Sequence, residues 1–134
     1  MRQVLAVDNI ARGFGASPLE VIDDGRLKVA FLAIPALFLA DGLRDVHKPV
    51  ALWVAALDDI VPVVPDFAIL RDGLPVRPVS HIEPDAGLYS FLAPYTRTQR
   101  AELYEICTDL PGFDRVAFHP RLNAAAVAFF RANL

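Results

Sequence analysis

Three short, nearly continuous apolar runs along the chain predict buried β-strands. They are KVAFLAI at residues 28–34, PVALWVAA at 49–56 and VRPVSHI at 76–82. Runs without polar alternation are typical of strands covered on both faces, as in parallel sheets. The internal Pro78 lacks an amide hydrogen for sheet pairing, which places the third strand at an edge of the sheet.

Helical segments follow these strands. A short helix or turn is expected at 41–46 and a longer helix at 65–71. Residues 98–107 predict another helix with Thr98 as its N-cap. A C-terminal amphipathic helix is expected at 121–134, where apolar residues recur at helical spacing: Leu122, Ala125, Ala126, Phe129 and Phe130. The alternation predicts an α/β fold, with a parallel sheet of three or slightly more strands flanked by helices.

The length of 134 residues suits one domain. Residues 1–24 give no clear pattern, because Gly13, Gly15, Ser17 and Pro18 interrupt their apolar positions. We therefore divide the chain into this N-terminal segment and an α/β domain at 25–134.

The composition of the chain limits the expected cellular compartment and the expected classes of binding partner. Hydrophobic residues make up 54% of the chain, which suits a packed core, and the net charge of −3 provides no general attraction to nucleic acid. A single cysteine, Cys107, excludes an internal disulfide and suits a reducing compartment. Asp8 and Asn9 interrupt a signal-peptide pattern, and the apolar stretch 29–40 is too short for a membrane span. A cytoplasmic protein without membrane or nucleic-acid partners is expected.

Four segments, taken in order and spacing, resemble the C-terminal half of α/β-hydrolases of the dienelactone-hydrolase-like kind. They are GRLKVA leading to IPA in 25–36, KPV through DDIVP in 48–62, DAGLYSFL at 85–92, and the tail 106–119 with IC, PGFDR and His119. The resemblance implies a partial α/β-hydrolase fold. It also implies a serine or cysteine nucleophile, a general-base histidine and an orienting aspartate that act on esters and lactones.

The resemblance assigns the orienting acid to Asp58, although Ala55 replaces the glycine of the matching turn. From residue types alone, Asp58 and Asp59 equally suit a solvated pair that closes a strand. Leu88 stands where the family carries its histidine, and leucine cannot transfer a proton. His81 would replace this base only if the loop 83–87 folds back toward Asp58; otherwise it is a partly buried strand histidine.

No nucleophile motif or cofactor site is evident. G-x-S-x-G is absent, since neither Ser17, Ser80 nor Ser90 has the required glycines. Cys107 lies in an apolar helical stretch and is expected in the core. The isolated histidines lack zinc-ligand spacing, and no phosphate-binding or dinucleotide motif is present. We expect neither a metal nor a cofactor.

Three functions follow. The first is a truncated or degenerate α/β-hydrolase domain without activity of its own. The second is an ester or lactone hydrolase whose site is completed by a partner chain. The third is a non-catalytic module that binds a small ester or carboxylate, or a partner, through a pocket lined by Leu57, Leu88, Tyr89 and Phe91.

A sheet that contains only the last hydrolase strands leaves the strand at 28–34 with an uncovered edge. Exposed strand edges promote association. We expect Met1–Val7, a second copy or another chain to cover this edge, and a homodimer that continues the sheet is the leading expectation.

Overall fold

The computed structural model describes residues 5–8, 26–33, 35, 43–59 and 63–134. In this part of the chain, four strands form one parallel sheet in the order β1-β2-β3-β4. The strands are β1 Leu5–Asp8, β2 Ala30–Ala33, β3 Val50–Ala55 and β4 Val79–Glu83. The protein is therefore a small α/β fold, as the alternating pattern predicts.

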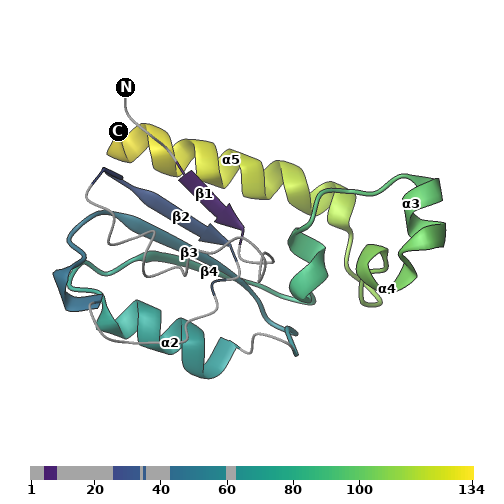
Figure 1. Ribbon diagram of the computed structural model, residues 1–134, viewed down its shortest axis with the longest axis horizontal. Helices are drawn as coiled ribbons and strands as arrows, with labels where there is room; N and C mark the ends of the chain where they lie inside the picture. Colours follow the sequence, from purple (N-terminus) through teal and green to yellow (C-terminus); the bar gives the residue numbers. More distant parts are fainter. Residues whose placement is uncertain (1–4, 9–25, 34, 36–42, 60–62) are drawn as a thin grey trace.

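Helices flank this sheet and extend beyond it. They are η1 Leu43–Asp45, α2 Val63–Gly73, η2 Leu88–Phe91, α3 Arg97–Glu102, α4 Tyr104–Cys107 and α5 Arg115–Asn133. Helix α5 runs along one face of the sheet and α2 along the other, whereas α3 and α4 lie beyond the ends toward which the strands point (Figure 1). Among the helices that the structure describes, none is long and apolar enough to cross a membrane.

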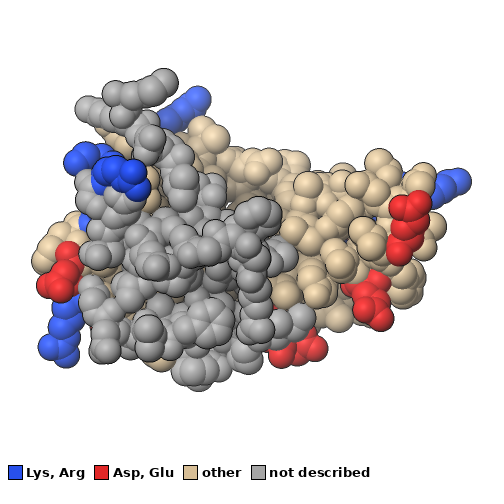
Figure 2. All heavy atoms as spheres, viewed as in Figure 1, with Lys and Arg blue, Asp and Glu red and all other residues tan. Residues whose placement is uncertain are grey.

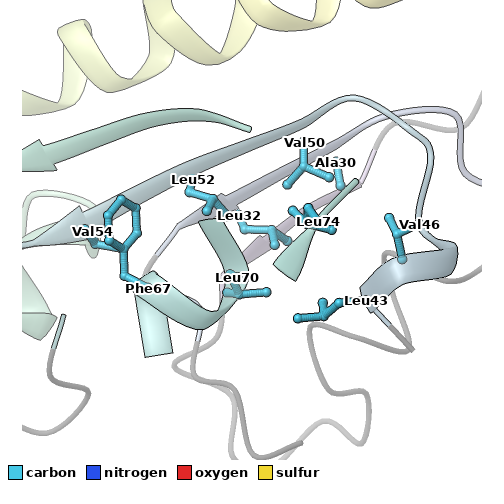
Figure 3. Packing of buried hydrophobic residues seen from close by; sticks show 10 residues of the cluster. All are labelled: Ala30, Leu32, Leu43, Val46, Val50, Leu52, Val54, Phe67, Leu70 and Leu74. Atoms are coloured by element: carbon cyan, nitrogen blue, oxygen red, sulfur yellow. The ribbon is translucent and has the colours of Figure 1, made fainter. Parts of the chain in front are cut away.

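The core consists of two clusters, one on each face of the sheet. All six residues of β3 are buried, and alternate side chains point to opposite faces. Toward α2, Leu52 packs with Leu32 of β2 and with Leu70 (Figure 3). Toward α5, Trp53 packs with Phe31 and Phe118. This two-sided burial explains why β3 reads as a continuous apolar run.

The strand predictions are confirmed to within a few residues. Strand β4 lies at one edge of the described sheet, as Pro78 predicts. Its side chains Val79 and Ile82 are 60% and 45% exposed. The apolar run there is consequently only half covered.

The predicted helix at 98–107 is wrong in its continuity and in its cap. The backbone breaks at Leu103 (φ −125°, ψ 52°), which separates α3 from α4. The N-cap is Thr96, whose side chain accepts a hydrogen bond from the Gln99 amide at 3.3 Å. The Gln99 side chain accepts one from the Thr96 amide at 3.0 Å. This reciprocal pair satisfies two helix-end donors, which a cap at Thr98 would not do.

Helix α5 begins six residues before the predicted position 121. Asp114 caps it by accepting a hydrogen bond from the Ala117 amide at 3.0 Å. Pro120 lies inside the second turn and removes one helical hydrogen bond. Burial of Phe118 and Leu122 on either side of Pro120 holds this turn in the helix.

The edge of β2 is covered by the chain itself. Strand β1 pairs with β2 in parallel, from Leu5 opposite Ala30 to Asp8 opposite Ala33. The expected cover by the N-terminal segment is thus realised at Leu5–Asp8, while residues 1–4 and 9–25 lie outside the described residues. A homodimer was expected to continue the sheet at the edge of β2. That edge is already occupied by β1 of the same chain.

Candidate functional site

Two loops lie side by side at the carboxyl ends of β3 and β4. The Ala56 amide donates a hydrogen bond to the Glu83 carbonyl at 3.0 Å, and the Leu57 amide donates one to the Ala86 carbonyl at 2.9 Å. Ligands of open parallel α/β sheets bind at the carboxyl ends of the strands. The two loops therefore form the candidate site.

Asp58 and Asp59 have different environments in the turn after β3. Asp58 is only 7% exposed, whereas Asp59 is exposed. The interpretation as a solvated acidic pair thus holds for Asp59 but not for Asp58. A buried carboxylate is costly without compensating interactions, so its retention requires a structural or functional reason. The role of Asp58 as an orienting acid stays a prediction.

Leu88 begins η2, directly after the loop that contacts the Asp58 turn. Its side chain is partly buried and packs against the core cluster on the α5 face. An isobutyl group therefore occupies the position that the resemblance assigns to a base. Ile60, Val61 and Pro62 of the matching turn lie outside the described residues.

His81 lies on β4 with a different partner. Its ring stacks on Trp53, with centroids 4.0 Å apart and planes 29° apart. Its Nε2 lies 2.8 Å from Oε2 of Glu83. The substitute-base hypothesis requires Asp58 as the partner of His81, but the structure gives it Glu83.

Glu83 and Arg121 are the residues that sequence reasoning missed. Arg121 of α5 donates to both Glu83 oxygens, at 2.6 Å and 3.3 Å. Burial raises the pKa of Glu83, but the hydrogen bonds from Arg121 and His81 outweigh it and lower that pKa below its ordinary value. The two-residue spacing of His81 and Glu83 places both on one strand face, and this signal was available in the sequence. The contact with Arg121, 38 residues away, was not.

A cavity of about 220 Å³ lies between the turn after β3, η2 and the segment after α4. Ten residues line it: Leu57, Asp59, Gly87, Leu88, Tyr89, Ser90, Glu105, Thr108, Asp109 and Leu110. Three of the predicted pocket residues are thus brought together. The fourth, Phe91, is 5% exposed and packs edge-to-face on Phe118 at 4.9 Å, so it belongs to the core.

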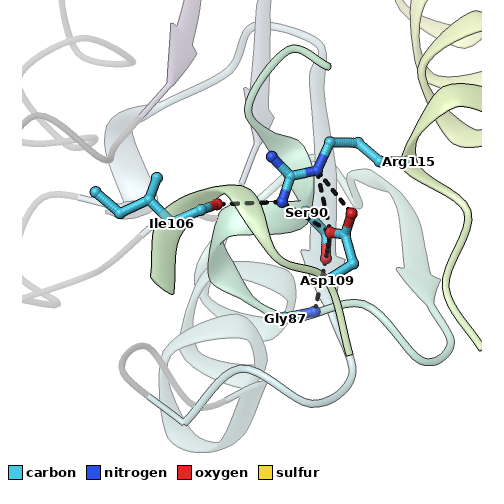
Figure 4. A network of polar contacts seen from close by, with 5 residues as sticks. All are labelled: Gly87, Ser90, Ile106, Asp109 and Arg115. Carbon is cyan, nitrogen blue, oxygen red and sulfur yellow. Dashed lines mark hydrogen bonds and ion pairs between the residues drawn. The ribbon is translucent and has the colours of Figure 1, made fainter. Parts of the chain in front are cut away.

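A partly buried polar network links Gly87, Ser90 and Asp109, which line this cavity, to Arg115 (Figure 4). The Ser90 hydroxyl accepts a hydrogen bond from the Gly87 amide and donates one to Oδ1 of Asp109, both at 3.1 Å. Arg115, which is 5% exposed, donates from Nε to both Asp109 oxygens at 3.0 Å and from Nη2 to Oδ1 at 2.8 Å. The network joins η2 to the start of α5 and compensates the charge of Asp109.

The carboxylates of Asp59 and Glu105 give the cavity an acidic rim. In the described part of the chain, neither Asp59 nor Glu105 makes an ion pair. Several acidic side chains visible in Figure 2 lie at the end of the molecule that carries α3 and α4. An unpaired negative rim disfavours a carboxylate ligand.

A second, larger cavity of about 430 Å³ lies on the other side of Thr108, Asp109 and Leu110. Arg100, Tyr104 and Val116 also line it. Its lining includes Cys107, which is 2% exposed and has its thiol 3.6 Å from the Gln99 carbonyl. This thiol is a buried core group, as predicted.

The described residues provide no complete catalytic arrangement. Ser80 donates to the Pro78 carbonyl at 3.2 Å and Ser90 to Asp109, while Cys107 contacts Gln99. None of these three makes a described hydrogen bond to a histidine. No group of three or more metal-ligating side chains occurs among the described residues, and Ser17 lies outside them.

Comparisons of this chain with protein-family models, with curated proteins and with solved structures each gave no match. Small parallel α/β folds serve many unrelated functions, so the fold does not identify an activity. The features that bear on function are the two loops and the cavity that they line.

Proposed function

We propose that this chain is a degenerate α/β-hydrolase-like domain that has lost hydrolysis and binds a small, uncharged or cationic molecule in the 220 Å³ cavity. The observation that carries the proposal is Leu88. This alkyl side chain lies at the loop beside the buried Asp58 turn, and it also forms part of the cavity wall.

The order of the strands supports the kinship with hydrolases. Strands β1 to β4 follow one another in space as they do in sequence, and all are parallel. Consecutive strands from the C-terminal half of a larger hydrolase sheet would have this arrangement. The resemblance of the four sequence segments supplies the remaining support.

Loss of hydrolysis follows from the chemistry of acyl transfer. A serine or cysteine nucleophile needs a base within hydrogen-bond reach, and the base needs an orienting acid. Leu88 cannot accept a proton, and His81 is held by Glu83. Removing such a base from a working enzyme typically lowers kcat by about 10⁶-fold.

The cavity favours a particular class of ligand. Its volume of about 220 Å³ suits a molecule smaller than most drugs. Leu57, Leu88, Leu110 and Tyr89 provide apolar walls, and the acidic rim repels anions. Of the two ligands expected from the sequence, a small ester fits these properties better than a carboxylate, and a small alcohol or amine fits them as well.

Hydrolysis is tested with p-nitrophenyl acetate on the wild type, Asp58→Ala and the matched surface control Asp59→Ala. We expect all three to release p-nitrophenol at the same slow rate, since no base is positioned. Turnover by the wild type that is lost in D58A but kept in D59A would establish an active hydrolase instead.

Binding is tested by amide NMR with benzyl alcohol, benzylamine and benzoate. We expect the alcohol and the amine to shift the amide signals of Gly87 and Leu88, and benzoate to shift them least. Gly87→Val narrows the cavity and should reduce the shift of the Leu88 amide signal. Absence of a response to all three probes would contradict the binding proposal.

A further inference from the structure

Strand β4 has a partner strand on one side only. In the described part of the chain it pairs with β3 and forms the edge of the sheet opposite to β1. Its side chains are poorly covered, since Val79 is 60% exposed, Ile82 is 45% exposed and Ser80 is also exposed. The side of β4 that faces away from β3 is called the open edge below. Such an edge presents unpaired backbone donors and acceptors to which a further strand can bind.

The direction of the backbone groups along β4 follows from one hydrogen bond. The Glu83 carbonyl accepts a hydrogen bond from the Ala56 amide at 3.0 Å, so the backbone groups of Glu83 face β3. In an extended strand, the amide and carbonyl of one residue point to one side and those of the next residue point to the other. His81, two residues before Glu83, therefore faces β3 as well. The amides and carbonyls of Ser80 and Ile82 consequently point to the open edge.

Prolines limit the open edge at both ends. Pro78 lies two residues before Ser80. Pro84 lies two residues after Ile82. Neither proline has an amide hydrogen, so along this stretch only Ser80 and Ile82 can donate to an added strand. The open edge is thus short and symmetric about His81, with one donor on each side of it and a proline beyond each donor.

A strand with this symmetry fits a second copy of itself in antiparallel orientation. With a two-fold axis at His81, Ser80 of one copy lies opposite Ile82 of the other, and the two residues exchange both backbone hydrogen bonds. Pro78 of one copy then lies opposite Pro84 of the other. The pairing therefore ends at both sides where the donors end, and no amide of this stretch is left facing a proline ring.

The side chains at the open edge are complementary in the same arrangement. On the face that α2 covers, Ile82 approaches Ile82 of the other copy diagonally across the axis. On the face that α5 covers, the exposed Val79 lies diagonal to His81 of the other copy. Arg77 before the strand and Asp85 after it are both exposed. Antiparallel pairing brings the Arg77 end of each copy to the Asp85 end of the other, so opposite charges meet at both ends.

We propose that the open edge of β4 is a homodimer interface, in which two copies pair this strand antiparallel about His81 and join their sheets into one. The pairing is short, so the dimer is weak and dissociates on dilution in about the micromolar range. The interface uses none of the residues that line the 220 Å³ cavity. It forms whether or not that cavity binds a ligand.

Sedimentation velocity of the full chain from about 1 µM to about 1 mM tests the association. We expect the wild type to change from monomer to dimer with rising concentration. Ile82→Lys places two ammonium groups close together across the axis and should shift the association to at least about 10-fold higher concentration. Val127→Lys is the matched control, because Val127 is 47% exposed on α5, and it should associate like the wild type. A wild type that stays monomeric throughout, or equal association in I82K and V127K, would overturn the proposal.

Amide hydrogen exchange of the wild type locates the contact without relying on any variant. Raising the protein concentration should slow the exchange of the Ser80 and Ile82 amides by about 10-fold or more, because they gain hydrogen bonds only in the dimer. The His81 amide between them faces β3 in both states, so its exchange should change far less. Association that leaves the Ser80 and Ile82 amides unchanged, or that slows those of Leu5–Asp8 instead, would contradict an interface at β4.

Discussion

Individual side chains in the two loops determine which chemistry the candidate site can perform. Asp58 is buried where an orienting acid is expected, but the following loop presents the alkyl group of Leu88. The strongest polar contacts near the cavity are structural, since Ser90 and Arg115 are both bound to Asp109. These contacts fix the shape of the cavity. Its ligand is selected by the apolar walls and by the acidic rim of Asp59 and Glu105.

Arg115→Met should destabilise the protein by about 3 kcal/mol or more. The substitution leaves the Asp109 carboxylate, whose side chain is only 16% exposed, without its cation. Urea unfolding measures the effect. Arg100→Met is the matched control, because Arg100 is exposed and should contribute less than about 1 kcal/mol. Similar losses of stability in the two variants would show that the Arg115–Asp109 pair contributes no more than an exposed arginine.

Acid should weaken the fold through Glu83. Its pKa in the folded state lies below the ordinary value of 4.5, so its ion pairs stabilise the fold above that value. This stability is lost as the pH falls through the lower folded-state pKa. The difference in unfolding free energy between the wild type and E83Q should therefore be largest at neutral pH and should shrink below pH 4. A difference that is constant from pH 7 to pH 3 would refute this assignment.

Helices and strands differ in how well their positions follow from local sequence. The strands were predictable because burial on both faces leaves a continuous apolar run, as in β3. The start of α5 was not, because Pro120 suggests a helix boundary, whereas tertiary burial of Phe118 carries the helix through it. The break at Leu103 was missed for a related reason, since no glycine or proline marks it.

Asp114→Ala should cost about 1 kcal/mol of stability through the start of α5. The alanine leaves the Ala117 amide without its side-chain acceptor, which lies at 3.0 Å in the wild type. Asp114→Asn retains an acceptor and should be nearly neutral. Urea denaturation of both variants checks the pair, and a neutral D114A would show that the cap contributes little.

The molecule as a whole is a four-stranded α/β layer whose candidate site lies at the carboxyl ends of β3 and β4. Sequence reasoning predicted this end of the sheet, and three of the cavity residues, because strand ends and the following loops can be located from apolar runs. It did not predict that Glu105 and Asp109 line the same cavity, because this depends on how α4 and the segment after it return to the loops, as in the hydrogen bond from Ser90 to Asp109. Such contacts join segments about 20 residues apart without a sequence pattern.

The central claim is that the Asp58 turn and the Leu88 loop are the remains of an acid–base pair. Leu88→His restores an imidazole to the loop, and its pKa can be measured by NMR titration with and without Asp58→Asn. We expect the pKa of the new imidazole to be higher in L88H than in L88H/D58N, by about one unit, because a facing carboxylate stabilises the imidazolium. Equal pKa values in the two variants would show that Asp58 does not face this loop, and the account would fail.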